Sequence, residues 1–283
     1  MGRTSVRCVS VDGVNLNFLE AGSGDPVVLL HGIPTYAYLW REVLPGVADR
    51  HRAFAPDLLG CGRSDKAEYR DFSIPAQAEL VSKFIAQLDV GPVALVGHDL
   101  GAAIAQVVAM KYPGTVNRLA LINPPDGQTY ARMQLERYRP AELARKTTVE
   151  EILQFLRTSL PSQVGGRTKL SLEVLENYLI PWETPAGMGA LFQLARAIDH
   201  HTIEQLLEQM QQVSLPTLVV AGAEDELSPV ESCRRVAESI PGATLETLEA
   251  TGHLAPEESP HELARMLDRF LTHAREERPT TVH

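Results

Sequence analysis

The sequence predicts an α/β fold in which a mainly parallel, twisted sheet carries helices on both faces and a helical segment is inserted. Two observations lead to this prediction. Short apolar runs alternate with segments of helical periodicity over residues 27–123 and again over 217–272, a pattern typical of parallel sheets covered by helices. Between these regions the apolar runs stop, and apolar residues recur only at helical spacing.

The first elements in chain order form a hairpin. Residues 6–11 and 16–20 are predicted as antiparallel strands around the turn Asp12-Gly13. The elements that follow are strands over 27–30, 52–56, 93–96 and 118–123, with helices over 36–44, 75–88 and 101–111 between them. Ligands of such sheets bind beyond the carboxyl ends of the strands, so polar residues that follow strands are the first candidates for a site.

The inserted segment is expected to be helical and to consist of at least three pieces, because Pro161, Pro181, Pro185 and Gly165-Gly166 interrupt it. The alternation then resumes, with strands predicted over 217–221 and 244–248 and helices over 229–239 and 260–272. We therefore expect a core domain made of residues 1–123 and 216–283 and a helical cap, or lid, made of residues 124–215.

Composition and charge narrow the classes of partner. The chain has 36 acidic and 26 basic residues and a net charge of −10, which argues against a nucleic-acid partner because the phosphates would be repelled. Cys8, Cys61 and Cys233 form no C-x-x-C pair, so we expect no disulfide framework, no metal and no cofactor. No stretch has the length and apolarity of a signal peptide or a membrane span, and we expect a cytoplasmic protein without a membrane partner.

The most informative stretch is the motif Gly97-x-Asp99-x-Gly101, which lies between a predicted strand and an Ala-rich helix. Its spacing matches the elbow G-x-S-x-G, in which flanking glycines let a strained residue project its side chain from the edge of the sheet. Here an aspartate takes the place of the serine. A carboxylate suits displacement at a saturated carbon, where it forms an alkyl ester, whereas attack on an ester would give a reactive anhydride. Asp99 is therefore the candidate nucleophile.

Two further residues follow predicted strands at the same edge. Asp225 follows the strand over 217–221, and His253 follows the strand over 244–248. Each has an ordinary explanation by itself, as a helix cap or a turn residue. Together with Asp99 they have the chain order nucleophile, acid, histidine, which predicts a catalytic triad. His253 would activate a water that hydrolyses the ester, and the N–H groups of Ile33 and Leu100 would form the oxyanion hole.

The motifs resemble those of the α/β-hydrolase superfamily, in particular its branch with an aspartate nucleophile, the haloalkane dehalogenases and epoxide hydrolases. The resemblance covers nearly the whole chain. The matching pieces are His31–Thr35, Tyr38–Arg41, Asp57–Asp65, Gly97–Ala102 and the segments around Asp225 and His253. The resemblance implies the α/β-hydrolase fold with an inserted helical cap, a hydrolase that forms an ester on Asp99, and a small apolar organic substrate with water as the second reactant.

The resemblance leaves the substrate open. Haloalkane dehalogenases hold the halide with a Trp after the nucleophile and an Asn or second Trp, but Leu100 and Ile33 stand at these positions and their side chains donate no hydrogen bond. Fluoroacetate dehalogenases carry an Arg where this chain has Leu100, which disfavours a small carboxylate substrate. A dehalogenase-like hydrolase is our first hypothesis and an epoxide hydrolase with the same triad is the alternative. A non-hydrolytic or ligand-binding member of the fold is the second alternative.

Several cap side chains are candidates for contact with the substrate. Epoxide hydrolases protonate the ring oxygen with two lid tyrosines, and the inserted segment offers Tyr130, Tyr138 and Tyr178. Trp182 could also face the pocket, and Tyr178 and Trp182 are the pair to test first. Packing within the cap is the alternative role for each of these residues.

Overall fold

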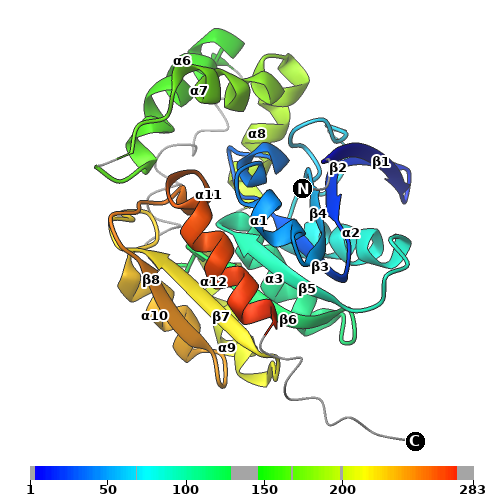
Figure 1. Ribbon diagram of the computed structural model, residues 1–283. Helices are drawn as coiled ribbons and strands as arrows, with labels where there is room; N and C mark the ends of the chain where they lie inside the picture. The colour runs from blue at the N-terminus through cyan, green and yellow to red at the C-terminus, as the bar shows by residue number, and fades with distance from the viewer. Residues whose placement is uncertain (1–3, 68, 129–145, 167, 198–199, 273–283) are drawn as a thin grey trace, which may run out of the picture.

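The computed structural model describes residues 4–67, 69–128, 146–166, 168–197 and 200–272. An eight-stranded sheet runs through its centre (Figure 1), in the order β1-β2-β4-β3-β5-β6-β7-β8. The strands are β1 (Ser5–Val11), β2 (Val14–Gly22), β3 (Asp25–Leu30), β4 (His51–Pro56), β5 (Val93–His98), β6 (Val116–Ile122), β7 (Thr217–Gly222) and β8 (Thr244–Leu248). The β1–β2 and β2–β4 pairs are antiparallel, and all other neighbours are parallel. The predicted fold class is confirmed.

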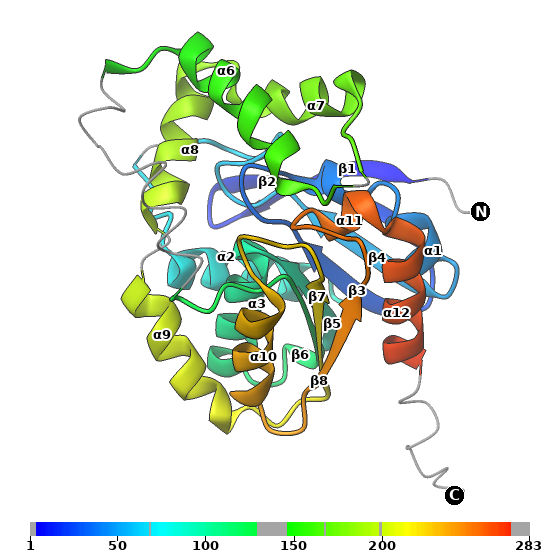
Figure 2. The ribbon, with the colours of Figure 1, turned by 90° about the vertical axis from the view of Figure 1, so that its left-hand side faces the viewer.

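Helices cover both faces of this sheet. They are the 3-10 helix η1 (Ala37–Trp40), α1 (Leu44–Ala48), α2 (Ile74–Gln87), α3 (Leu100–Lys111), α10 (Val230–Glu238), α11 (Ala255–Glu258) and α12 (Pro260–Thr272). Figure 2 shows α2, α3 and α10 on one face and α1 and α12 on the other. In agreement with this view, α2 packs on α3 and α1 packs on α12. Because both faces are covered, β5 and β7 are buried along their whole length, which explains why they are continuous apolar runs in the sequence.

Between β6 and β7 the described residues form helices. These are α6 (Val149–Ser159), η2 (Pro161–Gln163), α7 (Leu172–Leu179), η3 (Ile180–Trp182), α8 (Pro185–Ala197), α9 (His200–Gln209) and η4 (Met210–Gln212). In Figures 1 and 2, α6, α7 and α8 lie above the carboxyl ends of the parallel strands, whereas α9 packs beside α3 of the core. The division into a core and a cap at residues 124 and 215 stays our proposal.

One predicted element is wrong. In place of the expected helix over 36–44, the 3-10 helix η1 covers 37–40, a turn covers 41–43, and α1 begins only at Leu44. Tyr36 is extended, with φ −153° and ψ −173°, and therefore does not begin a helix. Its hydroxyl donates to the Asn177 carbonyl group at 3.0 Å, a contact with a distant segment that apolar spacing in the sequence does not reveal.

The inserted helices carry their own start signals. Thr148 caps α6, because its hydroxyl accepts a hydrogen bond from the Glu151 N–H at 3.3 Å while the Glu151 side chain accepts one from the Thr148 N–H at 2.7 Å.

None of the helices among the described residues combines the length and the apolar character that a membrane span requires.

Candidate active site

Asp99 lies in the sharp turn between β5 and α3, at the carboxyl end of the sheet. Its backbone has φ 54° and ψ −123°, a conformation that side-chain-bearing residues rarely adopt and that stores strain. A Cβ atom at Gly97 would lie 2.3 Å from the carbonyl oxygen of Gly101, and one at Gly101 would lie 2.6 Å from that of His31. Glycine is required at both positions, which explains the Gly-x-Asp-x-Gly spacing physically.

The Asp99 carboxylate is fully buried and bound on two sides. Its Oδ2 accepts a hydrogen bond from the N–H of Ile33 at 2.9 Å, and its Oδ1 lies 3.7 Å from His253 Nε2. Leu100 begins α3, where backbone N–H groups have no acceptor within the helix. The Ile33 amide therefore already faces the carboxylate as an oxyanion-hole donor would, and the Leu100 amide is the second candidate.

His253 lies in the loop between β8 and α11 and is held from three directions. Its Nδ1 is 2.9 Å from Asp225 Oδ2. Its backbone N–H donates to the Gln163 carbonyl group at 2.8 Å, and its own carbonyl group lies 2.8 Å from His98 Nε2. Burial lowers the pKa of His98 to about 4, so its ring is neutral and can donate to this carbonyl group. His98 thus supports the His253 loop.

Asp225 follows β7 and accepts hydrogen bonds on both carboxylate oxygens. Oδ1 accepts from the N–H groups of Leu227 and Ser228 at 2.7 and 3.0 Å. Oδ2 is shared between His253 and the Asn123 side chain, whose Nδ2 donates at 2.6 Å. The sequence analysis missed Asn123. A signal was present, because Asn123 follows β6 and β6 is paired with β7 in the sheet.

The two carboxylates around the imidazole control its protonation. Burial disfavours the charged form of His253, but the charges and hydrogen bonds of Asp225 and Asp99 outweigh it and raise the pKa of His253 to about 10. Burial alone would raise the pKa of Asp225, yet His253 and the hydrogen-bond donors around it lower this pKa below its ordinary value. The arrangement is a buried carboxylate, imidazole and carboxylate chain, in which the central group carries the proton.

The two cap residues chosen for testing are buried in contacts between the inserted helices and the core. Tyr178 donates its hydroxyl hydrogen to Glu257 and packs edge-on against Tyr38, with ring centroids 5.5 Å apart. Trp182 donates its indole N–H to the carbonyl group of Pro34 at 3.1 Å. Both polar groups therefore have protein partners, and contact with substrate stays a prediction for these residues. Tyr130 and Tyr138 lie outside the described residues.

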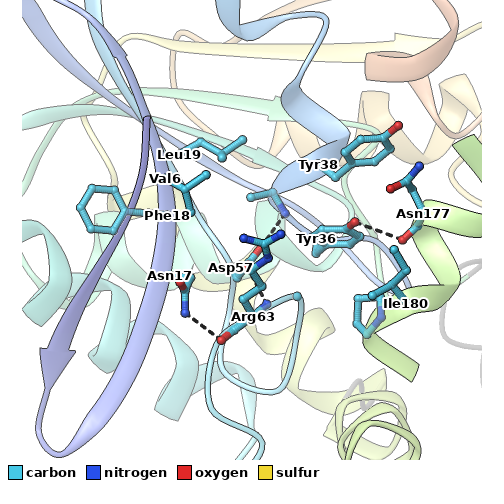
Figure 3. Close-up of a pocket in the computed structure, with 13 residues that line it drawn as sticks. Val6, Asn17, Phe18, Leu19, Tyr36, Tyr38, Asp57, Arg63, Asn177 and Ile180 are labelled. Atoms are coloured by element: carbon cyan, nitrogen blue, oxygen red, sulfur yellow. Dashed lines mark hydrogen bonds between the residues drawn. The ribbon is translucent and has the colours of Figure 1, made fainter. Parts of the chain in front are cut away.

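Two cavities lie near these elements. A polar cavity of about 290 Å³ is bounded by residues 162–166, by residues 224–227 and by His253. A hollow of about 220 Å³ is separate, bordered by Tyr36, Tyr38 and Arg63, and contains no triad residue (Figure 3). Burial raises the pKa of Asp57 in this hollow to about 6, but both its oxygens accept backbone N–H groups at 2.8 Å. The Asp57 carboxylate therefore already has protein partners, and the candidate triad stays our proposal for the chemistry.

The fold and the triad geometry can now be compared with known proteins. The family model for the alpha/beta hydrolase fold matches residues 25–260. The chain belongs to the alpha/beta hydrolase fold family. This family membership covers most of the chain, from β3 to the start of α12.

Two relatives and one solved structure are similar to this chain over most of its length. A haloalkane dehalogenase of Agrobacterium fabrum is 28% identical over 279 residues, which cover 92% of this chain and 89% of the relative. A cis-3-alkyl-4-alkyloxetan-2-one decarboxylase of Shewanella oneidensis is 25% identical over 285 residues, which cover 93% and 87%. The solved structure of the epoxide hydrolase CorEH has a TM-score of 0.85 at 23% identity, with 96% of this chain and 100% of that chain covered.

The family match and the dehalogenase relative confirm the resemblance inferred from the motifs. They support a hydrolase of this family. The same fold serves three differently named activities in these relatives, so the substrate of this chain has to be argued from its own residues.

Proposed function

We propose that this protein displaces a leaving group from a saturated carbon through a covalent alkyl ester on Asp99, with haloalkanes as the first substrate class. One observation carries the proposal: the buried Asp99 carboxylate is bound on one oxygen by the Ile33 N–H at 2.9 Å and faces His253 Nε2 with the other at 3.7 Å. A carboxylate held in this way attacks the substrate carbon with one of its oxygens from the side opposite the leaving group. The leaving group departs with the electron pair of the bond that breaks.

The second step hydrolyses this ester. Esterification removes the negative charge of Asp99, which is one of the charges that raise the pKa of His253. The imidazolium can then release its proton to solvent and become a base, while Asp225 continues to orient it and to stabilise its charged form. A water that gives a proton to His253 Nε2 attacks the carboxyl carbon of Asp99, and the oxyanion that forms accepts hydrogen bonds from the N–H groups of Ile33 and Leu100. When the oxyanion collapses, the bond between the carboxyl carbon and the alkyl oxygen breaks, and the leaving alkoxide takes the proton from His253 to give the alcohol.

The leaving group is the open part of this mechanism. The haloalkane dehalogenase relative supports a halide, yet the side chains of Ile33 and Leu100 are apolar and the Trp182 N–H is bonded to Pro34. This favours a second candidate class, a strained cyclic ester. Attack at its saturated ring carbon opens the ring and leaves a carboxylate, which needs less stabilisation than an alkoxide. Loss of carbon dioxide from this carboxylate then forms the double bond of an alkene and breaks the bond to Asp99, whose oxygen recovers the electron pair. The oxetanone decarboxylase relative supports this class.

An epoxide hydrolase is the third possibility and needs a proton donor for the ring oxygen. Tyr178 is the described candidate, and burial together with the neighbouring Glu257 raises its pKa well above the ordinary value. Its hydroxyl hydrogen is donated to Glu257, so it would have to leave this partner to reach a substrate. Epoxides therefore rank below the other two classes.

The test uses the purified protein with three probes: 1-bromobutane, styrene oxide and a cis-dialkyl β-lactone. Bromide release, diol formation, and carbon dioxide with alkene are the three products measured. Bromide release with butanol supports the first class. Carbon dioxide and alkene from the lactone alone would replace it with the second class, diol alone would select an epoxide hydrolase, and binding without turnover would favour a non-hydrolytic member of the fold.

The covalent route is tested separately from the substrate class. A single turnover in water enriched in ¹⁸O should give butanol that carries ordinary oxygen, because that oxygen comes from the Asp99 carboxylate. His253→Phe should accumulate an enzyme whose intact mass has increased by one butyl group, and Asp99→Ala should not. Heavy oxygen in the first product molecule would instead demonstrate direct attack by water.

A further inference from the structure

Residues 163–166, which comprise the last residue of η2 and the three residues after it, lie directly against the loop that carries His253. The N–H of His253 donates to the Gln163 carbonyl group at 2.8 Å. A Cβ atom at Gly252 would lie 2.5 Å from the backbone nitrogen of Gly165 and 2.8 Å from the Gln163 carbonyl oxygen. Glycine at position 252 therefore permits two backbones to touch, one from the insertion and one from the catalytic loop.

A single carboxylate joins these two backbones. Glu258, at the end of α11, accepts the N–H of Gly252 at 2.8 Å and the N–H of Gly165 at 2.6 Å, both on Oε2. Gly252 is the residue immediately before His253. Hydrogen bonds from backbone amides to an ionised carboxylate are about twice as strong as neutral ones. Glu258 thus holds the catalytic loop and the insertion together through one oxygen atom.

The neighbouring Glu224 makes a different contact. Its Oε2 accepts the N–H of Gly166 at 2.8 Å, so this side chain holds the inserted segment, whereas the backbone N–H of Glu224 donates to the Thr251 carbonyl group of the His253 loop at 2.8 Å. Burial raises the pKa of Glu258, and the Gly252 and Gly165 amides act against this shift. The half-buried Glu258 carboxylate is therefore stabilised by the two segments that it joins.

We propose that Glu258 is a positioning residue for the hydrolytic step, which keeps His253 in register with Asp99 while residues 163–166 rest against the histidine loop. The inference builds on the proposed function and makes it more specific. Formation of the ester requires Asp99 and the leaving group, whereas its hydrolysis requires His253. Loss of the Glu258 contact should therefore slow hydrolysis of the ester selectively. A residue that merely stabilises the fold would affect both steps alike.

The experiment separates the two steps with 1-bromobutane in single-turnover mixing. The bromide burst reports formation of the ester, and the decay of the butylated mass reports its hydrolysis. For Glu258→Ala we expect the decay to slow roughly ten- to a hundredfold while ester formation stays within about twofold of the wild type. Glu258→Gln, whose amide oxygen can accept both N–H groups, should restore most of the decay rate.

Two further carboxylate variants serve as comparisons. Glu224→Ala should slow the decay less than Glu258→Ala, because it removes a bond to Gly166 only. Glu262→Ala is the matched control, since this exposed side chain lies in the first turn of α12 and should leave both rates unchanged. An equal slowing in Glu224→Ala and Glu258→Ala would overturn the specific role of Glu258, as would a parallel loss of both steps in Glu258→Ala.

A second route keeps the test valid if Glu258→Ala does not fold. Gly252→Ala retains Glu258 but places a Cβ 2.5 Å from the Gly165 nitrogen and 2.8 Å from the Gln163 carbonyl oxygen, and because both are backbone atoms the two segments are pushed apart. It should show the same selective slowing, and wild-type decay would contradict the inference. His253→Phe distinguishes the two proposals. If His253→Phe accumulates the butylated enzyme and the variants that disturb the Glu258 contact do not, this inference alone is rejected. If His253→Phe accumulates no butylated enzyme, the proposed function is rejected and this inference with it.

Discussion

Gly32→Ala tests the packing around the candidate nucleophile most directly. Gly32 lies in the segment after β3, and a Cβ atom at this position would lie 2.2 Å from Asp99 Oδ2 and 2.4 Å from Asp99 Cβ. Asp99 has little room to retreat, because it is fully buried and its backbone is already in a strained conformation. The substitution therefore moves either the carboxylate or the segment that carries the Ile33 amide.

The size of the effect follows from these distances. An ordinary contact begins at 3.4 Å, so the overlap with Oδ2 requires a displacement of more than about 1 Å, and a misplacement of this size costs on the order of a hundredfold in rate. Overpacking of a buried site costs about 1–3 kcal/mol of the free energy of unfolding. We expect Gly32→Ala to fold, with reduced stability, and to form the ester about a hundred times more slowly than the wild type.

Bromide release in a single turnover measures this rate, and urea unfolding measures the stability. Gly114→Ala is the control, because its φ of +87° makes any side chain unfavourable while no atom lies within 4 Å of the new Cβ. It should lose about 1 kcal/mol of stability and keep its ester-formation rate. Equal ester-formation rates in Gly32→Ala and Gly114→Ala would refute this reasoning, because the clash with Asp99 would then have no effect beyond that of backbone strain far from the candidate triad.

Three other predictions concern the imidazole, its support and the insertion. The pKa of His253 is raised to about 10 and falls once Asp99 is esterified, and as the pH decreases less of the imidazole in the ester intermediate is in its neutral, basic form. The fraction of enzyme that carries the adduct, measured by intact mass, should therefore rise from about pH 9 to about pH 6, and a constant fraction would contradict this role of His253. Asn123→Ala removes the 2.6 Å hydrogen bond to Asp225 and should lower the free energy of unfolding in urea by about 1–3 kcal/mol. It should also slow ester hydrolysis more than ester formation, and equal slowing of both steps would indicate a purely structural contact. Thr148→Ala removes a helix cap and should lower stability by about 1 kcal/mol with unchanged bromide release; an unchanged melting temperature would argue against the cap.

Much of the fold could be predicted because its signals are local. The buried strands β5 and β7 are continuous apolar runs, and the helices that cover them repeat apolar residues at helical spacing. The elbow was equally local, since Gly97 and Gly101 flank Asp99 within five residues. The wrong helix over 36–44 marks the limit of periodicity, because apolar spacing does not distinguish one α-helix from a 3-10 helix followed by a turn.

The candidate site was harder to complete from the sequence. Asp225 and His253 could be found because each follows a predicted strand in the expected chain order. Asn123 was missed although it follows a strand, because its position alone does not show that its side chain meets Asp225. Glu258 could not be assigned, because a glutamate in a short helix is an ordinary surface residue in the absence of spatial neighbours. Their importance comes from the atoms they meet, namely a carboxylate of the triad and two backbone amides.

The sequence by itself determined the alternation of strands and helices, the inserted helical segment and the sharp turn at Asp99, because each depends on sterics and periodicity within one short stretch. Only the tertiary structure decided which groups surround that turn. The Ile33 amide meets Asp99 across 66 positions of the chain, and the His98 ring meets the His253 backbone across 155. Such contacts depend on how the sheet brings distant strand ends together, and hydrogen bonds between distant segments leave no periodic trace in the sequence.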